Sequence, residues 1–171
     1  YPYLFESREE DFIKIFKDVG RRGAYILQKD LDQFEAGLAT YCNAKYAIGV
    51  ANGTDAIWLA LEAAGVGEGD EVILSSHTYI ATAGAVAFVK AKPIPVECKE
   101  DWMIDPIAVE AAITSKTKAI LPTQLNGRCC DMDALRAIAN KHDLIIIEDA
   151  AQALGAKYKG EFAGTMGLAG T

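Results

Sequence analysis

The sequence lacks the patterns of a metal centre and of a surface for nucleic acid or membranes. Its 171 residues include only two histidines and four cysteines, and no C-x-x-C spacing occurs among them, so the usual zinc arrangements are excluded. Lysine and arginine are scattered, and the formal net charge is −7, which leaves no basic footprint for nucleic acid. No apolar run approaches the length of a transmembrane helix. We therefore expect neither nucleic acid nor a membrane as a partner.

The cysteines are Cys42, Cys98, Cys129 and Cys130. An adjacent pair rarely closes its own disulfide, because the geometry is strained. The first ten residues lack the basic and then apolar layout of a signal peptide. Hydrophobic residues make up 51% of the chain, enough for a folded domain with a full core. We expect reduced cysteines and a cytoplasmic protein.

A run of four large apolar residues at 144–147 is the clearest structural signal present. Such a run without alternation predicts a strand buried on both faces, as in the middle of a parallel sheet. Glu148 and Asp149 follow at the carboxyl edge, where open α/β sheets bind ligands. A carboxylate held there needs a cation or hydrogen-bond donors, and Gln152 places an amide near the same point. Asp149 could instead cap a following turn or helix, and this stretch alone does not decide.

Strand-like and helix-like segments alternate from Ala44 onward, with short links between them. This alternation predicts an α/β fold with a mostly parallel sheet covered by helices on both faces. The apolar, strand-like runs are 46–51, 71–74, 93–96, 118–121 and 144–147; the helical patterns are 54–64, 79–89, 106–113 (with Asp105 as N-cap and Pro106 at the first helical position) and 132–141.

Two amphipathic helices are expected before this alternation. Apolar residues at helical spacing mark residues 9–19, and the stretch 20–23, which contains Arg21 and Arg22, ends the helix. Asp30 with Gln33 three residues later resembles a capping box and opens a second helix that ends near Asn43. We divide the chain into an N-terminal helix and arm, residues 1–29, and a cofactor-binding large domain, residues 30–171. The arginine pair could face an anionic ligand, a partner chain or solvent.

The links that follow each strand should line one edge of a parallel sheet. They are the polar segments 52–55, 75–79, 124–127 and 149–152, whereas the opposite edge carries ordinary turn and charge chemistry. This asymmetry indicates a ligand site at the carboxyl edge.

The first of these links, Asn52-Gly53-Thr54-Asp55, precedes a helical pattern. Glycine lets a ligand approach the backbone, and the free amides and positive dipole end of a helix start suit a phosphate. The segment is neither a Walker loop nor G-x-G-x-x-G. Simple N-capping by Asn52 or Thr54 is the alternative.

Tyr79 stands at the end of the next strand, where its ring could cover a planar ligand or pack in the core. A phosphate cradle, an aromatic lid and an acceptor carboxylate together suit a flat, phosphorylated, cationic heterocycle. Pyridoxal 5′-phosphate fits this description, because its action as an electron sink needs a protonated ring nitrogen that a carboxylate stabilises.

Four segments, in this order and spacing, give the chain a specific resemblance. They are Asn52-Gly53-Thr54-Asp55-Ala56, Gly69-Asp70-Glu71-Val72-Ile73, His77-Thr78-Tyr79-Ile80-Ala81-Thr82 and Glu148-Asp149-Ala150-Ala151-Gln152. From about residue 30 to the end, the sequence resembles the nucleotide-sugar aminotransferases of the DegT/DnrJ/EryC1/StrS family. The resemblance implies the large domain of a pyridoxal-phosphate-dependent transferase of fold type I.

The resemblance also implies roles for individual residues. Asp149 would pair with the pyridine nitrogen, Gln152 would contact the ring hydroxyl, and Tyr79 would stack on the ring. Gly53, Thr54 and Asp55 would hold the phosphate, largely through backbone amides. Substrate contacts fall to Gln124 and Asn126, where this sequence departs from the family's usual histidine and tyrosine.

The family's Schiff-base lysine would lie beyond Thr171, together with the C-terminal part of the large domain and the small domain. We therefore expect an N-terminal fragment that does not transaminate by itself. The full-length protein would be a homodimer that transfers the amino group of glutamate to a nucleotide-linked keto-sugar. Two alternatives stay open: a deoxysugar dehydratase of the same fold with histidine in place of the lysine, and a non-catalytic binding or regulatory homologue.

Overall fold

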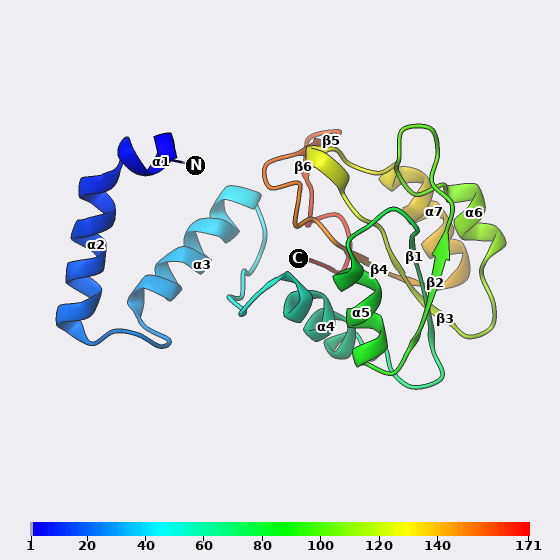
Figure 1. Cartoon of the computed structure of the whole chain (residues 1–171). Coiled ribbons are helices and arrows are strands. Elements are labelled where there is room, and N and C mark those ends of the chain that lie inside the picture. Colours follow the sequence, from blue (N-terminus) through cyan, green and yellow to red (C-terminus); the bar gives the residue numbers. More distant parts are fainter. Residues whose placement is uncertain (1) are drawn as a thin grey trace. The chain divides into compact units, whose positions relative to one another are not determined.

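The computed structural model describes residues 2–171 (Figure 1). The chain forms two compact units, Tyr1–Gly49 and Val50–Thr171. The division we expected between residues 29 and 30 differs from this boundary. The difference arises because the helix that starts at Lys29 is tied back to the preceding one: Arg22 Nη2 donates to Asp30 Oδ2 at 2.8 Å.

The first unit contains three helices: α1 (Pro2–Glu6), α2 (Glu9–Arg22) and α3 (Lys29–Cys42). Helix α2 runs through Gly20 to Arg22, farther than expected, and ends at Gly23, whose φ of 61° is left-handed. Of the arginine pair, Arg22 forms ion pairs with Asp18 and Asp30 within this unit.

The capping box expected at the start of α3 is wrong. Gln28 is the N-cap and makes no side-chain cap bond, so Asp30 lies inside the first turn. The end of the helix at Asn43 is confirmed, since Asn43 adopts the left-handed conformation at the C-cap. The apolar run 46–51 that follows forms neither strand nor helix.

The second unit is built on a parallel sheet, as the sequence predicted. Its strands are β1 (Glu71–Ser75), β2 (Lys92–Val96), β3 (Thr117–Leu121), β4 (Ile145–Glu148) and β7 (Ala169–Gly170), and their order across the sheet is β2-β1-β3-β4-β7. Every neighbouring pair is parallel. Strand β2 contains Pro93 and Pro95, which an edge position tolerates because one side of the strand makes no ladder bonds.

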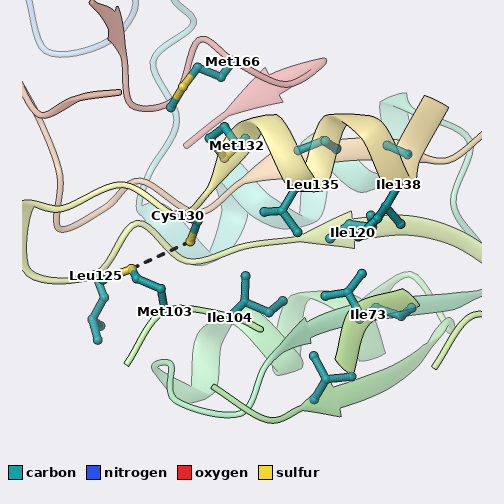
Figure 2. Packing of buried hydrophobic residues seen from close by; sticks show 14 residues of the cluster. Ile73, Met103, Ile104, Ile120, Leu125, Cys130, Met132, Leu135, Ile138 and Met166 are labelled. Atoms are coloured by element: carbon teal, nitrogen blue, oxygen red, sulfur yellow. Dashed lines mark hydrogen bonds between the residues drawn. The ribbon is translucent and has the colours of Figure 1, made fainter. Parts of the chain in front are cut away.

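Helices cover both faces of this sheet, which confirms the predicted architecture. Helices α4 (Gly53–Ala63) and α5 (Ile80–Phe88) bury one face; α6 (Pro106–Ala111) and α7 (Met132–His142) bury the other. Because side chains alternate along a strand, Val72 and Leu74 of β1 pack toward α4 and α5, whereas Ile73 packs toward α6 and α7. Figure 2 shows the buried residues on the α6 and α7 side, with Met132, Leu135 and Ile138 of α7 above the sheet.

The predicted starts of α6 and α7 are confirmed by their caps. Asp105 Oδ1 accepts a hydrogen bond from Ile107 N at 3.0 Å, with Pro106 at the first helical position. Asp131 Oδ1 accepts from Ala134 N at 3.2 Å. Helix α6 ends at Ala111, two residues before the expected end.

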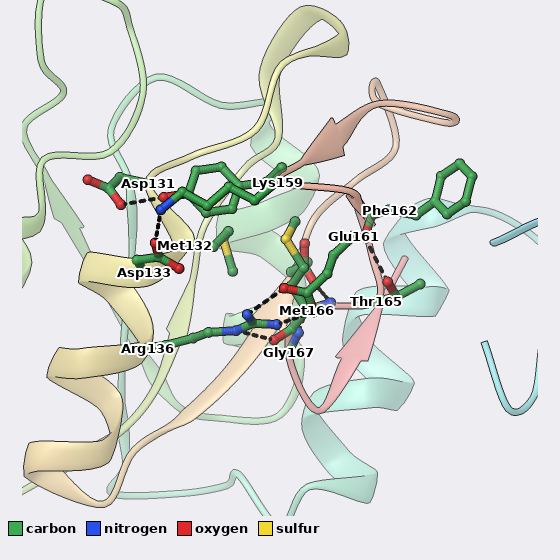
Figure 3. Close-up of polar contacts among 12 residues, drawn as sticks. Asp131, Met132, Asp133, Arg136, Lys159, Glu161, Phe162, Thr165, Met166 and Gly167 are labelled. Atoms are coloured by element: carbon green, nitrogen blue, oxygen red, sulfur yellow. Dashed lines mark hydrogen bonds and ion pairs between the residues drawn. The ribbon is translucent and has the colours of Figure 1, made fainter. Parts of the chain in front are cut away.

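A two-stranded hairpin, β5 (Lys157–Tyr158) and β6 (Glu161–Phe162), is fastened to α7. Arg136 holds Glu161 through two bonds of 2.8 and 2.9 Å, and Lys159 pairs with Asp133 (Figure 3). The guanidinium holds the pKa of Glu161 below its ordinary value. These contacts orient the hairpin on the helix next to the sheet's carboxyl edge.

Within residues 2–171, no helix has the length and apolar character needed to cross a membrane.

Candidate functional site

The carboxyl ends of β3 and β4 stay paired beyond the strands themselves. Thr123 and Asp149 form an isolated parallel bridge. Asp149 N donates to Pro122 O at 3.0 Å, and Gln124 N donates to Asp149 O at 2.8 Å. This pairing fixes the backbone of Asp149 at the edge of the sheet.

The side chain of Asp149 is enclosed, with 6% of its surface exposed. Its Oδ2 accepts a hydrogen bond of 2.6 Å from the hydroxyl of Thr82, and its Oδ1 accepts a longer one, 3.4 Å, from Ala151 N. Residues 150–156 form turns rather than a helix. Asp149 therefore caps a turn only through one long contact, and its shorter bond goes to a distant part of the chain.

Sequence reasoning missed Thr82, which lies in α5 and is fully buried. The available signal was a hydroxyl residue inside an otherwise alanine-rich, apolar helix. Such a residue needs a partner when it is buried.

The start of α4 shows the expected cap and leaves amides free for a ligand. Asn52 Oδ1 accepts from Asp55 N at 3.0 Å, so N-capping by Asn52 is confirmed. Of the three amides assigned to phosphate binding, that of Asp55 is thus already engaged. The amides of Gly53 and Thr54 belong to the first turn and have no acceptor within the helix. A Cβ placed on Gly53 would meet no atom within 4 Å, so open space adjoins this turn.

Tyr79 does not pack in the core. It is the N-cap residue of α5 and is 70% exposed. The alternative that its ring is a core side chain is therefore wrong, and the ring stays available to cover a ligand at this edge.

Gln124 does not stand where a substrate could reach it. The side chain is fully buried. Its Nε2 donates to Glu148 Oε2 at 2.7 Å, and its Oε1 accepts from Cys130 N at 2.7 Å. The substrate contact expected for Gln124 is corrected to a structural role, because both ends of its amide are engaged by the protein.

Asn126 and Gln152 are brought together, as their places on the predicted edge required. Asn126 lies in a short 3₁₀ turn, η1 (Leu125–Gly127), with φ of 53°. The backbone N–H of Asn126 donates a hydrogen bond to Gln152 Oε1 at 3.1 Å, and both residues are exposed. Asn126 remains a candidate for substrate contact.

Glu148 and Asp149 are adjacent in sequence but separate in role. Glu148 is fully buried and accepts hydrogen bonds from the amides of Gly164, Met166 and Gly167 at 2.9, 2.6 and 2.8 Å, in addition to Gln124. It therefore holds the loop before β7 against the sheet, whereas Asp149 faces the edge. The resemblance gave a role to Asp149 alone, and the sequence offered no role for Glu148.

The nearby thiol of Cys130 is not a nucleophile. Burial raises its pKa to about 12, and its Sγ lies 3.3 Å from Thr123 O. It stays a thiol at neutral pH, and only the thiolate attacks.

The family model described as the DegT/DnrJ/EryC1/StrS aminotransferase family matches residues 6–171. The chain belongs to this family. The match also includes α2, which the resemblance found in the sequence, from about residue 30 onward, had left out.

Relatives of known name agree with this membership. The chain is 53% identical over 139 residues to a dTDP-3-amino-3,4,6-trideoxy-alpha-D-glucose transaminase of Streptomyces venezuelae, covering 81% of this chain and 37% of the relative. It is 48% identical over 168 residues to a pleiotropic regulatory protein of Geobacillus stearothermophilus, covering 98% of this chain and 45% of that one.

A solved structure shows the same fold. The crystal structure of S. venezuelae DesV, in complex with a ketimine intermediate, matches with a TM-score of 0.93 and 47% identity, covering 96% of this chain and 44% of that one. The chain thus spans less than half the length of the relatives it matches.

Proposed function

We propose that this chain is the cofactor-binding part of an aminotransferase that moves the amino group of glutamate to the keto carbon of a nucleotide-linked sugar, with pyridoxal 5′-phosphate as cofactor. The observation that carries the proposal is Asp149: an enclosed carboxylate at the carboxyl edge of a parallel sheet, in a member of an aminotransferase family. Membership also supports the reaction class, since the S. venezuelae relative is named a sugar transaminase.

The residues present fit a flat, phosphorylated, cationic heterocycle. Asp149 would receive the ring nitrogen, Gln152 the ring hydroxyl, and exposed Tyr79 would cover the ring face. The free amides of Gly53 and Thr54, with Asp55 next to them, would hold the phosphate at the positive end of α4. When bound, the cofactor supplies an electron sink next to the reacting carbon.

The positions of these residues suit the roles that we propose for them. The Asp149 carboxylate would hold a proton on the ring nitrogen, because opposite charges at contact favour the charged form of both groups. Tyr79 would exclude water from one face of the ring. Asn126, linked to Gln152, would contact the sugar substrate.

The partner and compartment are part of the same proposal. A homodimer and a cytoplasmic location are expected for the whole protein. Among the described residues all four cysteines are free, which suits a reducing compartment.

The test is an isotope-transfer assay on the whole protein. It is incubated with pyridoxal 5′-phosphate, ¹⁵N-glutamate and a panel of nucleotide-linked 3-keto- and 4-keto-sugars, and products are weighed by mass spectrometry. We expect one keto-sugar to gain a ¹⁵N-amine, with equimolar 2-oxoglutarate. Loss of a sugar hydroxyl without ¹⁵N incorporation would identify a dehydratase instead.

A regulatory role is a second candidate, because one relative that covers 98% of this chain is named a pleiotropic regulatory protein. It predicts that the whole protein binds a nucleotide sugar without turning it over. Binding seen by calorimetry, with no product from any keto-sugar in the assay above, would favour it over the aminotransferase.

A further inference from the structure

Behind Asp149 lies a chain of three threonine hydroxyls. Thr82 Oγ1 is 2.6 Å from Asp149 Oδ2, Thr78 Oγ1 is 2.7 Å from Thr82 Oγ1, and Thr123 Oγ1 is 2.8 Å from Thr78 Oγ1. The three residues come from different segments: α5, the link after β1 and the link after β3. Thr82 and Thr123 are buried, and Thr78 is half-buried.

The carboxylate sets the direction of every bond in this chain. An ionised carboxylate only accepts hydrogen bonds, and each hydroxyl has a single proton to donate. Thr82 gives its proton to Asp149, so it must accept from Thr78. Thr78 has then used its own proton and must accept from Thr123. The chain therefore runs one way, from Thr123 through Thr78 and Thr82 to Asp149, and bonds aligned in this manner polarise and strengthen one another.

The same geometry assigns different tasks to the two carboxylate oxygens. Oδ2 is held at 2.6 Å by Thr82, whereas Oδ1 has only the 3.4 Å contact with Ala151 N. Oδ1 therefore retains the capacity to accept a strong bond from a cationic N–H group. Because Oδ2 is held, the orientation of the whole carboxyl group, and so the position of Oδ1, is set before any ligand arrives.

We propose that Thr82 is a positioning residue: it orients Asp149 so that Oδ1 meets the protonated ring nitrogen of the cofactor, and Thr78 and Thr123 fix the direction of its donated bond. The proposal rests on the cofactor assignment made above. It goes beyond that assignment by making cofactor affinity depend on a hydroxyl that does not itself touch the ligand.

The experiment measures noncovalent binding by the whole protein. The probe is pyridoxamine 5′-phosphate, whose amine forms no covalent link to a lysine, so its affinity reports the noncovalent contacts alone. A second probe is its analogue with the ring nitrogen replaced by C–H. The variants are Thr82→Val, which keeps the shape and removes the hydroxyl, and Thr82→Ser, which keeps the hydroxyl. Thr40→Val is the matched control, since the Thr40 hydroxyl donates only to Ala36 O within α3.

We expect Thr82→Val to weaken binding of pyridoxamine 5′-phosphate about tenfold, the scale of a hydrogen bond to a charged group. Binding of the C–H analogue should change by less than about twofold. Thr82→Ser should restore most of the affinity, and Thr40→Val should bind like the wild type. In an Asp149→Ala background, Thr82→Val should not weaken binding further, because the carboxylate through which Thr82 acts on the ligand is absent.

Two results would overturn the positioning role. One is an equal loss for both probes, which would mean that Thr82→Val merely disturbs packing. The other is wild-type affinity in Thr82→Val. If the wild-type protein binds neither probe, the proposed function fails first and the positioning role fails with it. A crystal structure of Thr82→Val adds a readout that needs no ligand: the Asp149 carboxyl group should be rotated or disordered.

Discussion

The side chains of Gln124 and Glu148 meet in the interior at the ends of two neighbouring strands, with Nε2 and Oε2 2.7 Å apart. Both are fully buried. The carboxylate also receives three backbone amides from the loop 164–167. A buried charge is tolerated when hydrogen bonds replace its hydration. This pair therefore joins β3, β4 and the loop before β7 into one unit, and holds the edge on which Asp149 stands.

Removing this acceptor should be costly. Glu148→Ala removes the acceptor of three backbone amides and of the Gln124 Nε2 group, which keeps only its 3.3 Å contact with Met132 Sδ. We expect the free energy of unfolding to fall by about 3 kcal/mol or more, because each buried donor left without an acceptor costs about 1–3 kcal/mol. Urea denaturation followed by circular dichroism measures it. Glu68→Ala, at an exposed turn, is the control and should change stability by less than about 0.5 kcal/mol.

Asp149→Asn should lower the rate of amino transfer without lowering the stability of the fold. The amide keeps the size of the side chain and can still accept the Thr82 bond through its oxygen, so the unfolding midpoint should stay near that of the wild type. It carries no charge to stabilise a protonated ring nitrogen. We expect kcat/KM for amino transfer by the whole protein to fall about 10²- to 10³-fold, as for loss of one preorganised electrostatic group. Activity within threefold of wild type would contradict the role given to Asp149.

Tyr79 should contribute to binding but not to stability. Since the ring is 70% exposed, Tyr79→Ala should leave the melting temperature within about 1 °C. Loss of a stacked aromatic face should weaken binding of pyridoxamine 5′-phosphate about 2- to 10-fold. Tyr79→Phe keeps the ring and should bind like the wild type. A drop in stability for Tyr79→Ala would show instead that the ring packs against the protein.

Cys130 should resist alkylation. Burial raises the pKa of its thiol to about 12, so at pH 8 roughly one molecule in 10⁴ carries the thiolate, against about a quarter for an ordinary thiol. Iodoacetamide labelling followed by peptide mass spectrometry should therefore find Cys130 modified at least about 10²-fold more slowly than Cys42 and Cys98. Cys129, half-buried and also with a raised pKa, should react at an intermediate rate.

The raised pKa of Cys130 also makes the stability of the fold depend on pH above about 9. Burial raises the pKa of the Cys130 thiol in the folded state above that of the same thiol in the unfolded chain. Between about pH 9 and 12 the unfolded chain loses this proton while the folded chain retains it. The stability that the buried thiol contributes below pH 9 is therefore lost progressively as the pH rises. Cys130→Ala should show a shallower decline over that range in denaturation experiments at stepped pH.

Local sequence pattern was sufficient to predict most strands and helices of the second unit. The unbroken apolar run before Glu148 predicted an inner strand, and Asp105-Pro106 predicted a helix start, because burial on two faces and capping depend on residues close together in sequence. Chain direction also placed 75–79, 124–127 and 149–152 after β1, β3 and β4, on one side of the parallel sheet. The grouping of 52–55 with them rested on a strand at 46–51, which the structure does not form.

The capping box at Asp30 failed for a tertiary reason. Its carboxylate is drawn to Arg22 of the preceding helix, an interaction between residues that periodicity within one segment does not reveal. The strand β7 was likewise not foreseen: its two residues pair only with β4, and no two-residue pattern predicts a strand.

What the sequence alone determined is the fold class and the edge of the sheet at which the links after β1, β3 and β4 gather, since these follow from hydrophobic period and chain direction. What the tertiary structure decided is which polar side chains face outward. Gln124 and Glu148 satisfy each other inside, Tyr79 lies outside, and Asp149 is held by Thr82, which is 67 residues away along the chain. Hydrogen-bond partners so far apart in sequence are set by packing, and no local pattern records them.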